Sequence, residues 1–125
     1  MSEQKGSLKV ALTAATTTAV GGVLKLVNPE GADVIVKRVV LDIITASTGA
    51  ATVDAGIDTD GTTSSDTLLD GLDVNAAAGV FDNVDDQGTN GQSCVKWASG
   101  EYLVITASAT VAGLVGNAYV EYDRV

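Results

Sequence analysis

The chain has 125 residues, no histidine and a formal net charge of −9. This length suits one domain with one hydrophobic core. The missing histidines exclude histidine-based triads and zinc sites of the histidine type. The negative charge argues against nucleic acid and membrane partners, because an acidic surface repels phosphate groups.

The composition favours strands and tight turns. Alanine, valine, threonine and glycine are abundant, whereas aromatic residues make up only 4% of the chain. Small and β-branched residues with many glycines suit long helices poorly. We therefore predict an all-β fold, an antiparallel β-sandwich or jelly-roll-like barrel, formed by residues 7–125 as a single domain. Residues 1–6 are polar and are predicted to form a flexible arm.

Two observations bear on the compartment. No basic segment followed by an apolar stretch opens the chain, so we expect no signal peptide and synthesis in the cytoplasm. Cys94 is the single cysteine, which rules out an internal disulfide and suggests a small buried side chain.

Taken in order, residues 7–12 and 23–27 alternate as two short strands. Residues 28–31 (Asn-Pro-Glu-Gly) then form a β-turn, with proline and glycine at the positions that such turns favour. Residues 34–45 are the longest β-branched run in the chain, and residues 51–57 alternate again after a short glycine-containing connection. This spacing predicts a hairpin at the centre of an antiparallel sheet.

The central run has two apolar faces. Lys37 falls among the residues predicted to point inward, where a charged side chain is unfavourable. Either a β-bulge near Lys37 or a position at the rim of the sheet would resolve this conflict. The predicted inward residues are Ile35, Val39, Leu41 and Ile43. The opposite face carries Val36, Val40 and Ile44, which suggests cover by a partner subunit or by a loop of the chain itself.

The last part of the chain returns to regular alternation. Residues 94–97, 101–108 and 114–122 are predicted strands, and Tyr119 shares a polar face with Glu121. Tyr119 therefore joins the interface candidates Val36, Val40 and Ile44. The sequence Ile-Thr-Ala-Ser occurs at residues 44–47 and again at 105–108, which could mark a duplicated hairpin, one in each sheet.

A long irregular loop region occupies residues 58–92. It carries many aspartates, of which Asp58, Asp60 and Asp66 are candidate calcium ligands because calcium prefers carboxylate and carbonyl oxygens. The EF-hand spacing is not met, so solvated loops without any cofactor are the simpler interpretation. A loop this long in a small domain usually has a function or is held by a partner.

Three segments resemble small proteins encoded among the head genes of tailed bacteriophages and prophages. They are VNPEGADVIVKRVVLDIITASTGAATVDAGID, LLDGLDVNAAAGVFDN and GLVGNAYVEYDRV. Proteins of this kind are regarded as head decoration, or cement, proteins. The resemblance implies a non-enzymatic virion protein that binds the major capsid protein or another virion protein outside the assembled shell. It favours a homotrimer.

Two alternatives remain open at this stage. One is another virion component, such as a tail or head fibre. The other is a cell-surface β-sandwich module for adhesion or carbohydrate binding, with calcium as a candidate stabilising ion. The expected absence of a signal peptide argues against the second alternative.

Overall fold

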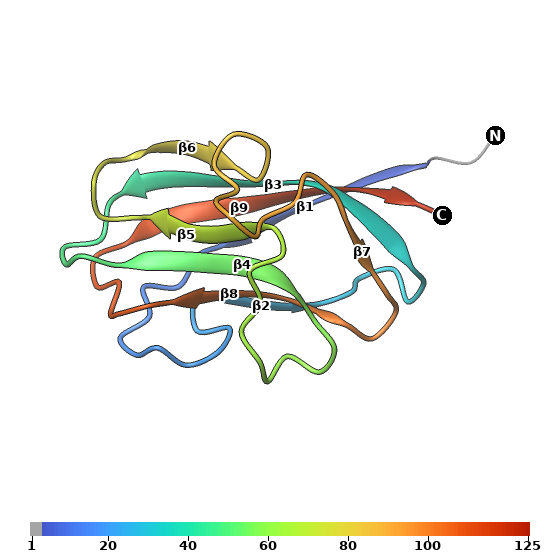
Figure 1. Cartoon of the computed structure of the whole chain (residues 1–125), viewed down its shortest axis with the longest axis horizontal. Helices are drawn as coiled ribbons and strands as arrows, with labels where there is room; N and C mark the ends of the chain where they lie inside the picture. Colours follow the sequence, from blue (N-terminus) through green and yellow to red (C-terminus); the bar gives the residue numbers. More distant parts are fainter. Residues whose placement is uncertain (1–3) are drawn as a thin grey trace.

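The structure is a computed structural model that describes residues 4–125, and its strands form two antiparallel sheets packed face to face (Figure 1). The five-stranded sheet contains β1 (Lys5–Ala11), β3 (Val34–Thr45), β6 (Gly79–Asp82), β7 (Val95–Trp97) and β9 (Val115–Arg124). The four-stranded sheet contains β2 (Leu24–Val27), β4 (Thr52–Asp58), β5 (Leu69–Asp73) and β8 (Tyr102–Ala107). The predicted all-β sandwich is confirmed. Within residues 4–125 no helix is long and apolar enough to cross a membrane.

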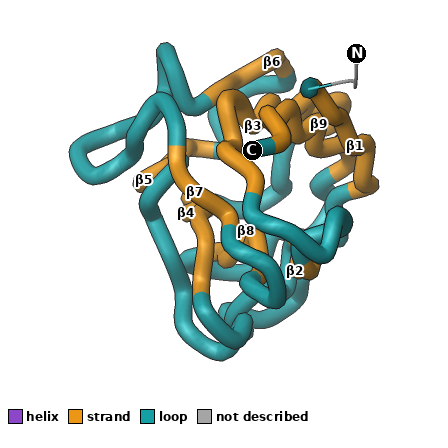
Figure 2. Tube along the Cα trace, turned by 90° about the vertical axis from the view of Figure 1, so that its right-hand side faces the viewer, coloured by secondary structure: helices purple, strands orange, loops and turns teal. Residues whose placement is uncertain are grey.

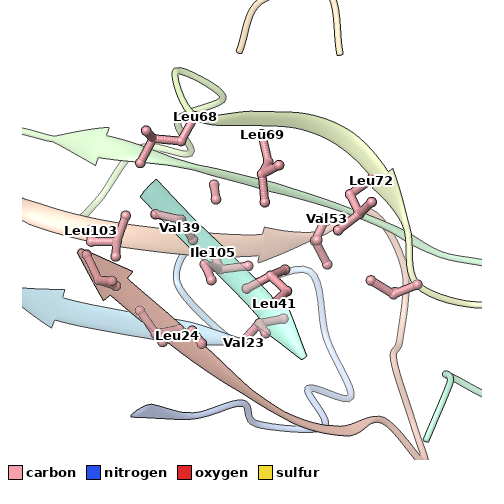
Figure 3. Close-up of a cluster of buried hydrophobic side chains, with 14 of the residues drawn as sticks. Val23, Leu24, Val39, Leu41, Val53, Leu68, Leu69, Leu72, Leu103 and Ile105 are labelled. Atoms are coloured by element: carbon pink, nitrogen blue, oxygen red, sulfur yellow. The ribbon is translucent and has the colours of Figure 1, made fainter. Parts of the chain in front are cut away.

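The strand orders place the longest strands at the centre. The five-stranded sheet has the order β1-β9-β3-β6, with β7 also beside β3, and the four-stranded sheet has the order β2-β8-β4-β5. Side chains from both inner faces fill the core, because successive residues of a strand point to opposite faces. Figure 3 shows Val39 and Leu41 of β3 in the same cluster as Leu103 and Ile105 of β8, and all four are fully buried.

The predicted central hairpin is wrong, although both of its strands exist. β3 pairs with β9, whereas β4 pairs with β8 in the other sheet. The connection between them crosses from one sheet to the other and bonds to other loops. Ser47 donates its backbone N–H to Val74, and Thr48 donates to Ala112, each at 2.9 Å.

The repeated Ile-Thr-Ala-Ser sequence marks two crossings of this kind. β3 passes to β4 after the first copy, and β8 passes back to β9 after the second. A duplicated hairpin in each sheet is therefore the wrong interpretation. The strands before and after the two crossings pair with each other instead: β3 pairs with β9 in one sheet, and β4 pairs with β8 in the other.

The bulge predicted near Lys37 is confirmed, and it corrects the faces of β3. The register of β3 against β9 slips between Val36 and Arg38, which leaves Lys37 and Arg38 together opposite Glu121. A bulge shifts the alternation by one residue. Val36 is consequently 0% exposed, and Ile35 is the half-buried residue, which reverses the prediction for both.

The N-terminal arm is shorter than predicted. Lys5 and Gly6 belong to β1 and pair with Asp123 and Tyr122 of β9. Gly6 lies so close to the ring of Tyr122 that a Cβ atom would not fit. Residues 1–3 of the predicted arm lie outside the described residues.

Asn83 completes the outer edge of the five-stranded sheet. β7 pairs with β3 up to Val36, and β6 pairs with it from Val40 onward. In between, the Val39 N–H donates to Oδ1 of Asn83 at 2.8 Å, and Nδ2 of Asn83 donates to the Gln92 carbonyl at 2.9 Å. The buried amide thus replaces the missing ladder bond and ties the loop region to the sheet.

Candidate functional site: the outer face of the five-stranded sheet

Loops of the chain cover the outer face of the four-stranded sheet, whereas the outer face of the five-stranded sheet is open to solvent. On the four-stranded sheet, the loop residues Ser65 and Thr67 directly cover Gly56 of β4. A second loop covers β8, where the Gly21 N–H donates a hydrogen bond to Oγ1 of Thr106 at 3.1 Å. Val104 points to this same side and is nevertheless 0% exposed. In Figures 1 and 2 the connecting loops lie below this sheet, on the side away from β3 and β9.

The outer face of the five-stranded sheet is the open one, and it brings three predicted residues together. Val40 of β3 lies directly opposite Tyr119 of β9. Ile44 lies further along β3 at a second register slip, between Ile43 and Thr45. Val40 is half-buried, whereas Tyr119 is 36% and Ile44 56% exposed.

The fourth predicted interface residue does not belong to this face. Val36 points into the core because the bulge at Lys37 reverses the alternation on its N-terminal side. At 0% exposure its side chain is not available for a contact with a partner.

Two further apolar residues of this face were missed by the sequence analysis. Val80 of β6 lies opposite Asp42 and is 67% exposed, and Val115 at the start of β9 is 50% exposed. Val115 is four residues before Tyr119 and shares its alternation, so the rule that selected Tyr119 would also have found it. Val80 could have been assigned only from the pairing of β6 with β3.

A tight ion pair fixes the β6 side of the face. An Nη atom of Arg38 lies 2.5 Å from Oδ2 of Asp82, while Oδ1 of Asp82 accepts the N–H groups of Val84 and Asp85. The hydrogen bond from Arg38 is the main cause that lowers the pKa of Asp82, with help from these backbone donors. The same carboxylate raises the pKa of Arg38.

The β1 side of the face is basic. Lys9 is exposed, pairs in register with Tyr119, and holds its Nζ atom 5.8 Å from the centre of the tyrosine ring. This is a cation–π contact. An open hollow of about 490 Å³ lies where β1 begins and β9 ends. Its charged lining residues are Lys5, Lys37, Glu121 and Asp123. Both signs of charge meet there.

The calcium candidates do not converge. Asp58 and Asp60 share one turn, in which both accept the Thr62 N–H, and the Thr62 hydroxyl is the main cause that lowers the pKa of Asp60. Asp66 instead accepts a hydrogen bond from Asn90. Among residues 4–125 no three His, Cys, Asp or Glu side chains form a group that could hold a metal ion. Calcium binding by these loops stays a prediction.

Cys94 differs from its prediction. The thiol is exposed just before β7, although a buried small residue was expected. The buried residue of β7 is Trp97 instead. Its side chain is 0% exposed and donates the indole N–H to the Glu101 carbonyl at 2.9 Å.

The fold is similar to that of chains in two phage capsid structures. One is a chain from the capsid of Ralstonia phage GP4, with a TM-score of 0.61 and 17% identity, over 97% of this chain and 84% of that chain. The second is a chain from the capsid asymmetric unit of cyanophage Pam1, with a TM-score of 0.51 and 18% identity, over 98% and 84% of the two chains. By sequence, no family model and no curated protein matches. The predicted likeness to phage head proteins is thus confirmed at the level of the fold.

Proposed function

We propose that the chain is a non-enzymatic structural protein of a tailed-phage virion and decorates the outside of the assembled head. The observation that carries this proposal is the backbone likeness to a phage capsid chain, which spans 97% of this chain. A likeness of that extent concerns the whole domain rather than a shared motif.

The charge of the chain supports an outer location. With a net charge of −9, the protein would be repelled by packaged DNA if it lined the interior of a head. An outer position faces solvent and the protein shell instead. The partner that we propose is the major capsid protein or another virion protein, reached after synthesis in the host cytoplasm.

We further propose that the protein acts as a homo-oligomer and needs no cofactor. The resemblance in sequence favours a trimer. Many copies bound to a repetitive shell gain effective affinity, so a modest contact per copy is sufficient.

The experiment is a location test on virions of the phage or induced prophage that encodes this chain. Purified particles are analysed by mass spectrometry for the chain and by electron cryomicroscopy for its position. We expect the domain on the outer head surface in many symmetric copies, and its loss from particles when the gene is deleted.

Two outcomes would overturn this proposal. Density for the domain on the tail or on a fibre would place the protein in another virion component. Absence of the chain from purified virions would remove it from the particle altogether.

A further inference from the structure

We propose that the outer face of the five-stranded sheet binds a second copy of this chain. The inference rests on the homo-oligomer proposed above and specifies one face-to-face contact between two copies, which pairs copies and does not by itself close a trimer. Its test uses the purified chain alone, so it can fail or succeed without any virion.

Exposed apolar side chains are concentrated on this face. Among the described residues seven large hydrophobic side chains are exposed, and four of them lie here: Ile44, Val80, Val115 and Tyr119. Single exposed hydrophobic residues are ordinary, whereas a group on one flat surface marks a contact site. Half-buried Val40 joins the group through its pairing with Tyr119.

The rest of the sandwich explains why this face is the open one. The four-stranded sheet is covered by the chain's own loops, which bury even the outward-pointing Val104. Residues 4–125 provide no comparable cover for the outer side of β9 and β3 (Figures 1 and 2). This side is therefore open to another molecule.

The distribution of charge indicates a second copy as that molecule. The charged residues of β1 at one margin are both basic, Lys5 and Lys9. At the opposite margin, exposed Asp85 follows β6, and half-buried Asp42 of β3 lies beside Val80. Asp82 itself is buried and paired with Arg38, so it does not face a partner. A neighbouring copy can lay its basic margin over the acidic margin of the first, which brings the apolar residues together in between.

The size of the face suits such a contact. Ten residues of β9 extend about 34 Å, and four strands side by side are about 19 Å wide, which gives a flat footprint of at most about 650 Å². A standard interface buries about 800 Å² per partner. Projecting side chains such as Tyr119 and Val80 add area beyond the flat footprint.

The first experiment measures self-association of the full chain by sedimentation equilibrium. Val115→Glu and Val27→Glu form a matched pair, because both replace an exposed strand valine (50% and 44% exposed) on opposite sheets. We expect wild type and Val27→Glu to associate equally. Val115→Glu and Tyr119→Glu should associate about tenfold more weakly or worse, since a charge is placed within the apolar contact.

Circular dichroism and thermal melting of each variant establish that the fold is retained. A wild-type chain that stays monomeric at all concentrations would overturn the inference and leave the virion proposal intact. Equal association of Val115→Glu and Val27→Glu would overturn it as well.

A charge exchange tests the orientation of the two copies. Lys9→Glu and Asp85→Lys should each weaken association, because each places like charges across the contact between the β1 margin of one copy and the β6 margin of the other. The double variant should restore it, since the opposite charges then meet again with their signs exchanged. A double variant that associates as weakly as the two single changes combined would rule out this arrangement.

Discussion

The five-stranded and four-stranded sheets share one core, yet their outer faces differ in charge and in cover. The strands of the five-stranded sheet carry six basic and four acidic residues, whereas those of the four-stranded sheet carry one basic and four acidic residues. The more acidic sheet is covered by its own loops, and the more basic sheet is left open. Both inner faces are apolar because they pack against each other in one core. The outer faces differ, so they are the surfaces that can distinguish one binding partner from another.

The difference is repeated at the level of single aspartates. Asp82 in the five-stranded sheet has a cation, Arg38, which lowers its pKa. Asp54 in the four-stranded sheet has none. Its pKa is raised chiefly by burial, and further by repulsion from Asp70 and Asp66, although the Gly71 N–H partly compensates.

The largest expected effect tests whether the core is truly shared. Leu41→Asp and Leu103→Asp each place an unpaired charge in the core, one from each sheet, at positions that are 1% and 0% exposed. Such a burial costs several kcal/mol, comparable to the whole stability of a small domain. We expect both variants to be unfolded by circular dichroism at 25 °C. Wild-type melting of either one would mean that its sheet does not depend on the common core.

A smaller effect is expected where only the five-stranded sheet is changed. Asn83→Leu leaves the Val39 N–H and the Gln92 carbonyl without their partners, at a cost of about 2–4 kcal/mol. Urea unfolding measures this loss. Asn90→Leu in the same loop is the control, because Asn90 is exposed and loses only a surface hydrogen bond to Asp66, so its change should stay within about 0.5 kcal/mol. Equal losses in both variants would show that Asn83 does not replace the ladder bond.

The strands could be predicted from sequence because their signals are local. The β-branched run at 34–45 coincides with β3, and the turn at 28–31 has Gly31 at a positive φ of 67°. The pairing of strands could not be predicted. Whether β3 turns back on β4 or crosses to the other sheet depends on β9, about seventy residues later, which occupies the edge that a hairpin would need.

The candidate site was predictable to the same extent. Val40, Ile44 and Tyr119 followed from alternation within single strands. Val36 was assigned wrongly because simple alternation was carried through Lys37, without the one-residue shift that a bulge at this position imposes. Cys94 was assigned wrongly because residue type alone does not place a side chain at the end of a loop.

A pH-dependent loss is expected from Asp82→Asn. The asparagine Oδ1 can still accept from Val84 and Asp85, so the change removes mainly the charge that Arg38 binds. Because the pKa of Asp82 is lowered by folding, its carboxylate stabilises the fold above the ordinary pKa of about 3.9. That stability is lost as the pH falls through the lowered pKa.

Thermal melting from neutral to acidic pH measures this dependence. The variant should melt below wild type at pH 7 and approach it in acid. Asp85→Asn, which removes a neighbouring exposed carboxylate, should change the melting temperature less. A deficit that is the same at every pH would show that the charge of Asp82 is not what stabilises this margin.

The smallest effect, and the one with the opposite sign, is expected from Asp54→Asn. Folding raises the pKa of Asp54, so its contribution to stability is greatest below the ordinary pKa of about 3.9 and is lost as the pH rises through the raised value. The Gly71 nitrogen lies 2.8 Å from Oδ1 of Asp54, and the asparagine side chain keeps an oxygen that can accept this hydrogen bond. The substitution also removes the repulsion between residue 54 and the carboxylates of Asp66 and Asp70. The variant should therefore melt slightly above wild type at pH 7, and the two curves should converge in acid. A fall in melting temperature at neutral pH would mean that the four-stranded sheet stabilises this carboxylate after all, and the electrostatic contrast with Asp82 would then disappear.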